Sequence, residues 1–517
     1  MDRPNENAAL RFVDANARGP RADHPAFVEA DGAAMSYAEL GERSARLAAL
    51  YARHGIRREE RAAMLVLDRL EFPVIFWGSL KAGVVPVPLN TMLAGEVYRA
   101  ILADCRARAL FVSAELLDTV RPLLADHPWL ERVFVVGEAA EALPGGCHDF
   151  AAELAAGEPL ATVHADADEC AFWLYSSGST GEPKGVRHVH ASLGHTADTY
   201  GSAVLGIEPD DVVFSAAKMF FAYGLGNAMS FPMAVGATTV LLPGRPTPAA
   251  VADVLERHRP SVFCAVPTLY AALVQAFGQG AAAAPSTLRR CVSAGEALPE
   301  EVGRRWQALA GCEILDGVGS TEMLHIFLSN RPGDVVYGTS GLAVPGYELR
   351  LVDERGAEVA PGEIGELLVR GPSAATDYWN QRAKSRGTFE GEWTRSGDKY
   401  ELAESGRLVY CGRTDDMFKV SGIWVSPFEL EQALVGHPAV LEAAVVAARD
   451  EEGLEKPKAF VVLAEGAERD GLVEALKTHV KERIGLWKYP RWIEIVPDLP
   501  KTATGKIQRF RLREGEA

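Results

Sequence analysis

The sequence predicts an α/β fold: a large N-terminal domain of layered strands and helices, a small β-rich part, and a compact α+β domain at the C-terminal end. Two observations predict it. Over residues 36–136, and again over 212–266, apolar runs of strand length alternate with runs of helix length, which is typical of a largely parallel sheet covered by helices. From about Gly338, shorter apolar runs alternate with Gly/Pro turns, which indicates a β-rich part.

The elements of the first series follow from local signals. Ser36 and Glu39 have the spacing of a capping box and predict a helix that ends at Gly55. A second helix is predicted over 72–82, because Gly83 follows it. Strands are predicted at 62–67, 84–88, 108–113 and 132–136, with a helix over 114–124. The strand at 84–88 contains two prolines without N–H donors, so it should lie near a sheet edge.

The second series and the C-terminal end are predicted in the same way. Strands are expected at 212–215, 238–242 and 261–266, and a helix over 248–258. The β-rich part should contain strands at 348–352 and 366–370. Ser426 and Glu429 have capping-box spacing, with Pro427 at the first helical position. Strands at 443–447, 459–463 and 492–496 and a helix over 472–484 complete the α+β domain.

Size, charge and cysteine usage restrict the class of protein. With 517 residues the chain has room for roughly two to four domains, and 48% hydrophobic residues allow large cores. A net charge of −17 argues against nucleic acid and against an anionic membrane surface as partners. The seven cysteines form no C-x-x-C pair, which indicates reduced thiols in a cytoplasmic protein and argues against a cysteine zinc site. There is no signal-peptide core and no membrane span. The oligomeric state is not determined, and a homodimer stays open.

A stretch rich in glycine and hydroxyl groups follows the apolar run 171–175. It consists of Ser176, Ser177, Gly178, Ser179, Thr180 and Gly181, and Lys184 comes shortly after. Glycines let backbone N–H groups approach an anion, hydroxyls add donors, and the lysine adds positive charge. The stretch therefore predicts a cradle for a polyphosphate, with a flexible surface loop as the alternative. It is not a Walker A loop, because Pro183-Lys184-Gly185 replaces Gly-Lys-Ser/Thr.

Together with four later groups, this stretch resembles the adenylate-forming superfamily, which includes acyl-CoA synthetases, luciferases and peptide-synthetase adenylation domains. The groups are 293–299, 316–322, the pair 395–399 and 412–416, and 500–509. The resemblance covers essentially the whole chain. Benzoate-CoA ligases in particular are similar at 218–227, 320–330, 391–400 and 420–427.

The resemblance implies roles for individual residues in binding ATP. Besides the phosphate loop, ATP is expected to contact Gly295 and Glu296 in a turn beside adenine, and Asp316, Gly317 and Thr321 in the glycine turn over 316–322. Asp398 is expected at the ribose, with support from Arg413, and Lys506 is also expected to contact ATP. The catalytic residues implied are Thr321 at the α-phosphate, Glu322 as the ligand of Mg²⁺, and Lys506. One glutamate suffices because Mg²⁺ typically uses one or two carboxylates together with substrate phosphates. Lys506 would stabilise the approach of a carboxylate to the α-phosphate.

The resemblance also implies an acid pocket, a CoA face and a hinge. A small aromatic acid is expected among Ala222, Tyr223, Ala294, Gly319, His325 and Ile326, and ordinary core packing is the alternative for Tyr223, His325 and Ile326. Coenzyme A is expected at Lys419, Ser421, Gly422 and Trp424. Asp415 would be the hinge between an N-terminal domain over 1–414, with its β-rich part at about 338–414, and a mobile domain over 415–517.

The implied activity is that of an acid–thiol ligase. It would use ATP and Mg²⁺ to join benzoate, or a close aromatic carboxylate, to coenzyme A through an acyl-adenylate, with release of AMP and pyrophosphate. Alternatives are a CoA ligase for hydroxybenzoate, aminobenzoate, cyclohexanecarboxylate or a fatty acid, and an enzyme that loads a separate carrier protein. A nucleotide-binding protein without catalysis is disfavoured, because it would not need this whole set: Lys184, Thr321, Glu322, Asp398, Arg413 and Lys506.

Overall fold

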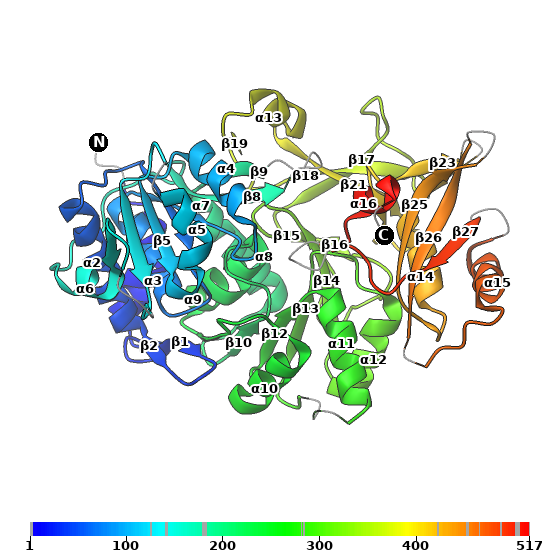
Figure 1. Ribbon diagram of the computed structural model, residues 1–517, viewed down its shortest axis with the longest axis horizontal. Coiled ribbons are helices and arrows are strands. Elements are labelled where there is room, and N and C mark those ends of the chain that lie inside the picture. The colour runs from blue at the N-terminus through cyan, green and yellow to red at the C-terminus, as the bar shows by residue number, and fades with distance from the viewer. Residues whose placement is uncertain are drawn as a thin grey trace.

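The computed structural model describes residues 4–124, 127–139, 143–177, 183–280, 282, 285–420, 423–450, 454–464, 466–485, 489–501 and 507–515. It is an α/β protein with a large N-terminal domain of mixed sheets and a smaller C-terminal domain, as expected from the sequence. The smaller domain lies at one end of the molecule, opposite the first helices and strands (Figure 1). No helix in the described part of the chain has the length and hydrophobicity of a membrane span.

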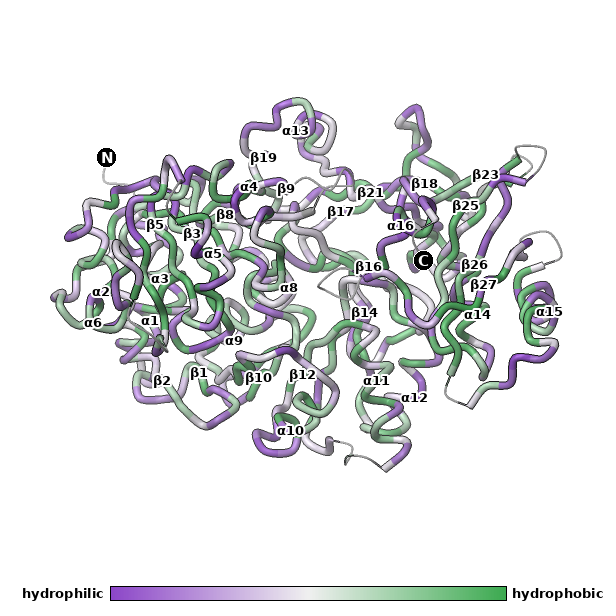
Figure 2. The backbone as a smooth tube through the Cα atoms, in the orientation of Figure 1, coloured by the Kyte–Doolittle hydropathy of each residue, from purple (hydrophilic) through white to green (hydrophobic). Residues whose placement is uncertain are grey.

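The first sheet is parallel and has five strands. In spatial order they are β4 (Val85–Pro88), β3 (Arg61–Leu65), β5 (Ala109–Ser113), β6 (Arg132–Val136) and β7 (Cys147–Asp149). The proline-containing strand β4 lies at the edge, as predicted. Figure 2 shows that β5 and helix α3 (Glu71–Ala82) are hydrophobic, which agrees with strands that are covered on both faces.

The second sheet has nine strands. Its order is β16 (Leu342–Ala343), β15 (Ile326–Ser329), β14 (Ile314–Gly319), β13 (Arg290–Ser293), β12 (Val262–Ala265), β10 (Val212–Ser215), β11 (Thr238–Leu241), β1 (Pro25–Glu29) and β2 (Ala34–Ser36). The central strands are parallel, whereas β2, β15 and β16 pair antiparallel at the two ends. The carboxyl ends of β10, β12, β13 and β14 therefore meet along one edge of the sheet.

Smaller sheets complete the fold. A three-stranded sheet joins β8 (Cys170–Ser177) and β9 (Pro183–Val189) to β19 (Asp377–Tyr378). The β-rich part contains β17 (Glu348–Val352), β18 (Ile364–Arg370), β20 (Phe389–Glu390), β21 (Trp393–Leu402) and β22 (Leu408–Arg413). A short pair, β23 (Phe418–Val420) and β24 (Ile423–Val425), follows it. The C-terminal sheet consists of β25 (Val440–Arg449), β26 (Glu455–Leu463) and β27 (Trp492–Ile495).

Helices begin and end where the sequence signals place them. In α2 (Tyr37–Arg53) Ser36 and Glu39 form the reciprocal capping box, and α3 ends at Gly83 with φ +71°. The helix expected over 114–124 is divided into η2 (Ala114–Leu116) and α5 (Leu117–Leu124). The others before β22 are η1 (Leu10–Asp14), α1 (Ala15–Ala17), α4 (Gly95–Cys105), α6 (Phe150–Ala155), α7 (His190–Thr196), η3 (Ala197–Leu205), α8 (Ala222–Leu225), η4 (Gly226–Ser230), α9 (Phe231–Val235), α10 (Pro248–His258), α11 (Pro267–Gly278), α12 (Glu300–Ala310) and α13 (Arg382–Thr388). Those after it are α14 (Pro427–Val435), α15 (Leu472–Ile484) and α16 (Arg509–Glu514).

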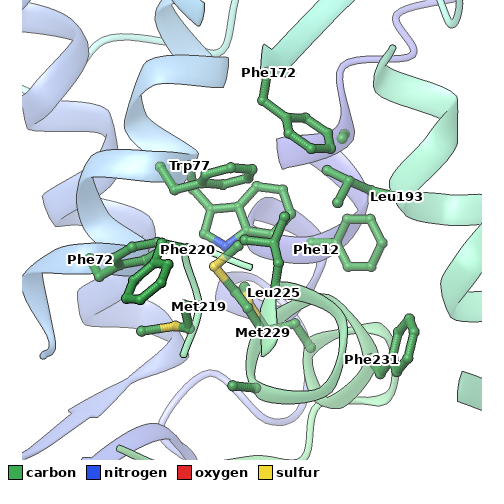
Figure 3. Packing of buried hydrophobic residues seen from close by; sticks show 14 of the residues in the cluster. Phe12, Phe72, Trp77, Phe172, Leu193, Met219, Phe220, Leu225, Met229 and Phe231 are labelled. Carbon is green, nitrogen blue, oxygen red and sulfur yellow. The ribbon is translucent and has the colours of Figure 1, made fainter. Parts of the chain in front are cut away.

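One hydrophobic core connects the two large sheets. Trp77 of α3 is fully buried and stacks on Phe12, with 5.2 Å between the ring centroids. Figure 3 shows how residues from α3, β8, α7 and the segment 219–231 surround this indole. Because α8, η4 and α9 pack into this core, the backbone that carries Ala222 and Tyr223 is held firmly against the sheet.

Candidate active site

The residues predicted to bind the acid lie at one edge of the nine-stranded sheet. Ala222 and Tyr223 belong to the segment after β10, Ala294 follows β13, and Gly319 is the last residue of β14. The carboxyl ends of parallel strands are the usual place for ligands in open α/β sheets. Residues far apart in sequence thus meet at one site.

Tyr223 and His325 form an aromatic wall at this edge. The Tyr223 hydroxyl donates to the carbonyl oxygens of Ala265 and Val292, at 3.2 and 3.0 Å, and so links the ring to the ends of β12 and β13. His325 Nε2 lies 3.2 Å from the Tyr223 carbonyl oxygen, so Nε2 carries the proton and donates it. The imidazole also contacts the Phe231 ring edge-on, with centroids 4.5 Å apart.

The position of His325 depends on two glycines. A Cβ atom on Gly226 would lie 2.4 Å from the imidazole Cδ2, and one on Gly319 would lie 2.6 Å from the His325 carbonyl oxygen. Burial lowers the pKa of His325 to about 3, although its hydrogen bond to Tyr223 opposes the shift. His325 is therefore neutral at physiological pH, and the contact that it can make is polar but uncharged.

The strand before the phosphate loop continues into a hairpin. β8 pairs antiparallel with β9, and Ser176 lies opposite Lys184 in the register. Lys184 is thus held in a strand that follows the glycine-rich stretch. Gly178, Ser179, Thr180 and Gly181 lie outside the described residues, and so does the side chain of Ser177.

Lys184 and Glu322 are half-buried and form a polar cluster with a third, buried residue, Tyr378. Lys184 Nζ lies 3.4 Å from Glu322 Oε1, and the Tyr378 hydroxyl donates to the same oxygen at 2.7 Å. Nζ also lies 4.4 Å from the centre of the Tyr378 ring. Burial alone would raise the pKa of Glu322, but the charge of Lys184 and the Tyr378 hydrogen bond outweigh it and lower the pKa. Glu322 is therefore a carboxylate.

This cluster fits a magnesium ion brought in with ATP. An ionised carboxylate is the ligand type that Mg²⁺ prefers, and one such ligand is enough when phosphates supply others. The Lys184 ammonium now neutralises Glu322, and the same charge could turn to a phosphate once a metal ion neutralises the carboxylate.

Replacing Tyr378 with phenylalanine is expected to weaken the use of MgATP. A hydrogen bond to a charged group contributes about 1.5–3 kcal/mol, so kcat/KM for MgATP should fall by about 10- to 100-fold. The effect should appear mainly in KM, because the hydroxyl orients Glu322 rather than reacting. Steady-state kinetics at varied Mg²⁺ and ATP measure it.

Tyr98→Phe is the matched control, since its buried hydroxyl donates to the Asn90 carbonyl oxygen at 2.7 Å and contacts none of the site residues. If Tyr378→Phe and Tyr98→Phe had the same KM for MgATP, Tyr378 would have no role in positioning Glu322.

Asp316 lies in β14, beside the residues predicted to border adenine. Its Oδ2 is 3.4 Å from the Leu298 backbone nitrogen, and its partner in the register is Ser293. Burial raises the pKa of Asp316 to about 8, against the opposing effect of these hydrogen bonds. The turn after β13 contains Gly295, whose φ of +98° few other residues adopt without strain. Residues 316–319 belong to strand β14, so the glycine turn expected over 316–322 begins only at Ser320.

Asp316→Asn should change how stability depends on pH. The folded-state pKa lies above the unfolded value, so this group stabilises the protein below about pH 4 and the contribution is lost as the pH rises through about 8. An asparagine side chain does not ionise, so the variant does not lose this contribution to stability as the pH rises. The melting temperature of Asp316→Asn minus that of wild type should therefore increase from about pH 5 to about pH 9.

Asp353→Asn serves as the control, because Asp353 is exposed and its pKa is lowered by turn hydrogen bonds. Its effect on melting temperature should be constant over that range. A constant difference for Asp316→Asn as well would show that Asp316 is ionised in the folded protein.

The predicted ribose group is held by paired strands. Asp398 in β21 lies opposite Arg413 in β22, and their side chains form an ion pair of 2.9 Å. Asp415 follows β22 at the entrance to the C-terminal domain, and its carbonyl oxygen accepts a hydrogen bond from Arg513 at 3.2 Å. Lys506, Ser421 and Gly422 lie outside the described residues, as do the side chains of Lys419 and Trp424.

Sequence reasoning missed Tyr378 and His188. His188 in β9 is fully buried, and its Nε2 lies 2.8 Å from the Thr321 carbonyl oxygen, so it supports the turn that carries Thr321 and Glu322. Burial lowers the pKa of His188 to about 4, so it acts as a neutral donor. Both residues lie more than fifty positions from their partners, and no local pattern marks them.

Comparisons with known proteins agree with this geometry. The family model of AMP-binding enzymes matches residues 13–379, and that of the AMP-binding enzyme C-terminal domain matches 429–506. A 4-hydroxybenzoate–CoA/benzoate–CoA ligase of Rhodopseudomonas palustris is 53% identical over 98% of this chain and 94% of its own length. A benzoate CoA ligase structure from Burkholderia xenovorans is 48% identical, with a TM-score of 0.90 over 99% of this chain and 100% of that one. An anthranilate CoA ligase bound to anthranoyl-AMP is 40% identical, with a TM-score of 0.94 over 99% and 97%.

Proposed function

This chain belongs to the AMP-binding enzyme family, and from that premise we propose that it is an acid–thiol ligase that joins benzoate, or a close aromatic carboxylate, to coenzyme A. ATP and coenzyme A are its co-substrates, and the acid is activated as an acyl-adenylate. The similarity to a benzoate-using ligase over nearly the full length supports the substrate class. The similarity to a structure that holds anthranoyl-AMP supports the intermediate.

One turn joins the two halves of the site, the half expected to hold phosphate and the half expected to hold the acid, and this arrangement supports the proposal most directly. The segment 320–325, between β14 and β15, contains Thr321 and Glu322 at one end and His325 at the other. Glu322 contacts Lys184, whereas His325 contacts Tyr223. An acid whose ring lies against Tyr223 and Ile326 would therefore have its carboxylate close to a phosphate held near Glu322, as in-line attack requires.

Each side chain then has a defined task in adenylation. Lys184 and Thr321 bind phosphate oxygens, Asp398 binds ribose with support from Arg413, and Tyr378 orients Glu322. Mg²⁺ held by Glu322 would supply further neutralisation of phosphate charge. Lys506 brings positive charge to the approaching carboxylate, and water is excluded by the wall of half-buried Tyr223 and buried His325.

For the second step we propose a separate C-terminal domain over 415–517 that turns at Asp415. The C-terminal sheet has its own core, which includes Val445, Val461 and Leu476. Such a unit can rotate as a rigid body about a few residues. It would then present the segment around Lys419, Ser421, Gly422 and Trp424 to coenzyme A.

A substrate panel tests the proposed activity. Pyrophosphate release and CoA-thioester formation would be measured with ATP, coenzyme A and either benzoate, 4-hydroxybenzoate, cyclohexanecarboxylate or dodecanoate. We expect benzoate to have a much higher kcat/KM than dodecanoate, because the wall of Tyr223 and His325 suits one ring. A higher kcat/KM for dodecanoate would refute the assignment to aromatic acids.

One observation favours 4-hydroxybenzoate as a second substrate. His325 donates through Nε2, so its buried Nδ1 is an acceptor, and this atom has no hydrogen-bond partner among the described residues. A ring hydroxyl that reached Nδ1 would satisfy it. Loss of 4-hydroxybenzoate activity, with benzoate activity retained, is then expected in His325→Phe.

A further inference from the structure

Three side chains that can bind a metal ion meet in the N-terminal domain. His54 directly follows α2, His148 lies in β7, and Glu153 lies in α6. One ligand atom from each lies within 4.8 Å of the other two. Neither α2, β7 nor α6 carries a residue assigned above to ATP, the acid or coenzyme A. We propose that His54, His148 and Glu153 form a site for a divalent transition metal ion, with Zn²⁺ as the ion of choice.

The distances are close to those that an ion would impose. His54 Nε2 lies 2.9 Å from Glu153 Oε2, and His148 Nδ1 lies 3.4 Å from Glu153 Oε1. Tetrahedral Zn²⁺ holds nitrogen and oxygen ligands about 2 Å away, so neighbouring ligand atoms are about 3.3 Å apart. An ion could therefore replace the proton between His54 and Glu153 with small movements of the side chains.

The surroundings fix the ligands but leave one position open. Phe134 packs against both imidazoles, with ring centroids 5.0 Å from His54 and 5.5 Å from His148. The side chain of His54 is 12% exposed, whereas those of His148 and Glu153 are 33% and 27% exposed. Water can thus supply the fourth ligand, and two imidazoles with one carboxylate suit Zn²⁺.

Charge near the site sets the expected affinity. Glu153 supplies a carboxylate oxygen, which is a usual ligand of Zn²⁺. Arg53 lies beside it, with Nη2 3.4 Å from Glu153 Oε2, and its positive charge opposes a cation. We therefore expect a micromolar dissociation constant, well above that of a structural zinc site with four ligands.

A bound ion would cross-link three elements. α2 precedes the first strands of the five-stranded sheet, whereas β7 and α6 belong to the segment after β6. An ion that binds the folded protein but not the unfolded chain raises stability as its concentration increases. The cysteines of the chain form no C-x-x-C pair, so they do not indicate a zinc site. His54 and His148 lie 94 positions apart, and such a distance has no pattern that would mark them as metal ligands.

The test uses the full-length protein after removal of metal with EDTA. Isothermal titration with ZnCl₂ should give one micromolar site, and the melting temperature should rise with Zn²⁺. His148→Ala and Glu153→Gln should each weaken this binding by about tenfold or more. His148 is the most exposed ligand, so its loss should disturb the fold least.

His479→Ala is the matched control. His479 and His437 form a second imidazole pair, with centroids 5.1 Å apart, but this pair has no third ligand in the part of the chain that the structure describes. The control should bind Zn²⁺ like wild type. Equal affinity and stoichiometry in wild type, His148→Ala and Glu153→Gln would overturn the proposal and leave a hydrogen-bonded cluster. Loss of binding in His479→Ala alone would place the ion at the other pair.

Discussion

Lys506→Ala will lower the rate of benzoyl-adenylate formation by about 10²–10³-fold or more, because it removes a positive charge that acts where charge develops in the transition state. In that step a carboxylate approaches the α-phosphate, and the two negative charges repel each other. In the second step a thiol attacks the carbonyl carbon of the adenylate, and this attack does not require the lysine. The variant should therefore convert supplied benzoyl-adenylate and coenzyme A to thioester at a rate close to that of wild type.

Single-turnover kinetics of each half-reaction measure this difference, and Lys501→Ala is the control. Lys501 lies five residues upstream, and its ammonium is already paired with Glu442 at 2.7 Å. Its removal should leave both half-reactions nearly unchanged. An equal decrease of both half-reactions in Lys506→Ala would show that the lysine does not act on adenylation alone.

Asp415→Pro should have the opposite effect: adenylation persists, whereas thioester formation falls by at least about tenfold. Proline fixes φ near −65°, so a hinge at this position would be held in one pose. Proline at this position would remove no hydrogen bond, because the N–H of Asp415 makes none among the described residues, and Asp415 does not have a positive φ. Asp415 lies inside the turn that is closed by the N–H groups of Asp416 and Met417, which both donate to the Arg413 carbonyl oxygen at 3.0 Å.

Asp415→Ala separates the backbone from the side chain. It removes the carboxylate but leaves φ free, and both half-reactions should continue. If alanine and proline had the same effect, or if proline abolished both steps equally, Asp415 would not be the point about which the C-terminal domain turns.

Local signals predicted individual elements well. The capping box of Ser36 and Glu39, and Gly83 after α3, mark helix ends through interactions within a few residues, and the structure confirms them. In α14 the same spacing gives half of the motif, since the Ser426 hydroxyl accepts from the Glu429 N–H at 3.0 Å. Most strand boundaries shifted by one or two residues, but β25 and β26 begin three and four residues before the predicted strands, because pairing with neighbours decides where a strand ends.

The order of strands and the contacts within the site could not be predicted from local patterns. Lys184 is held by β9, which pairs with β8 and with the two-residue strand β19, and no periodicity marks so short a strand. Asp398 and Arg413 lie 15 positions apart in the sequence, but they face each other in β21 and β22. The resemblance named Lys184 and Glu322, whereas Tyr378 between them became visible only in three dimensions.

The two-residue strand β19 also limits where the chain can be truncated. It covers the outer edge of β9, where Arg187 pairs with Asp377 at 2.6 Å and the Trp379 N–H donates to the Gly185 carbonyl oxygen at 2.8 Å. A truncated protein that ended before Asp377 would expose this edge, and unpaired strand edges promote self-association. It would also leave the indole of Trp173 without the partner ring of Trp379, 4.8 Å away. An N-terminal fragment prepared for biophysical work should therefore extend beyond Trp379, so that it does not self-associate through this edge.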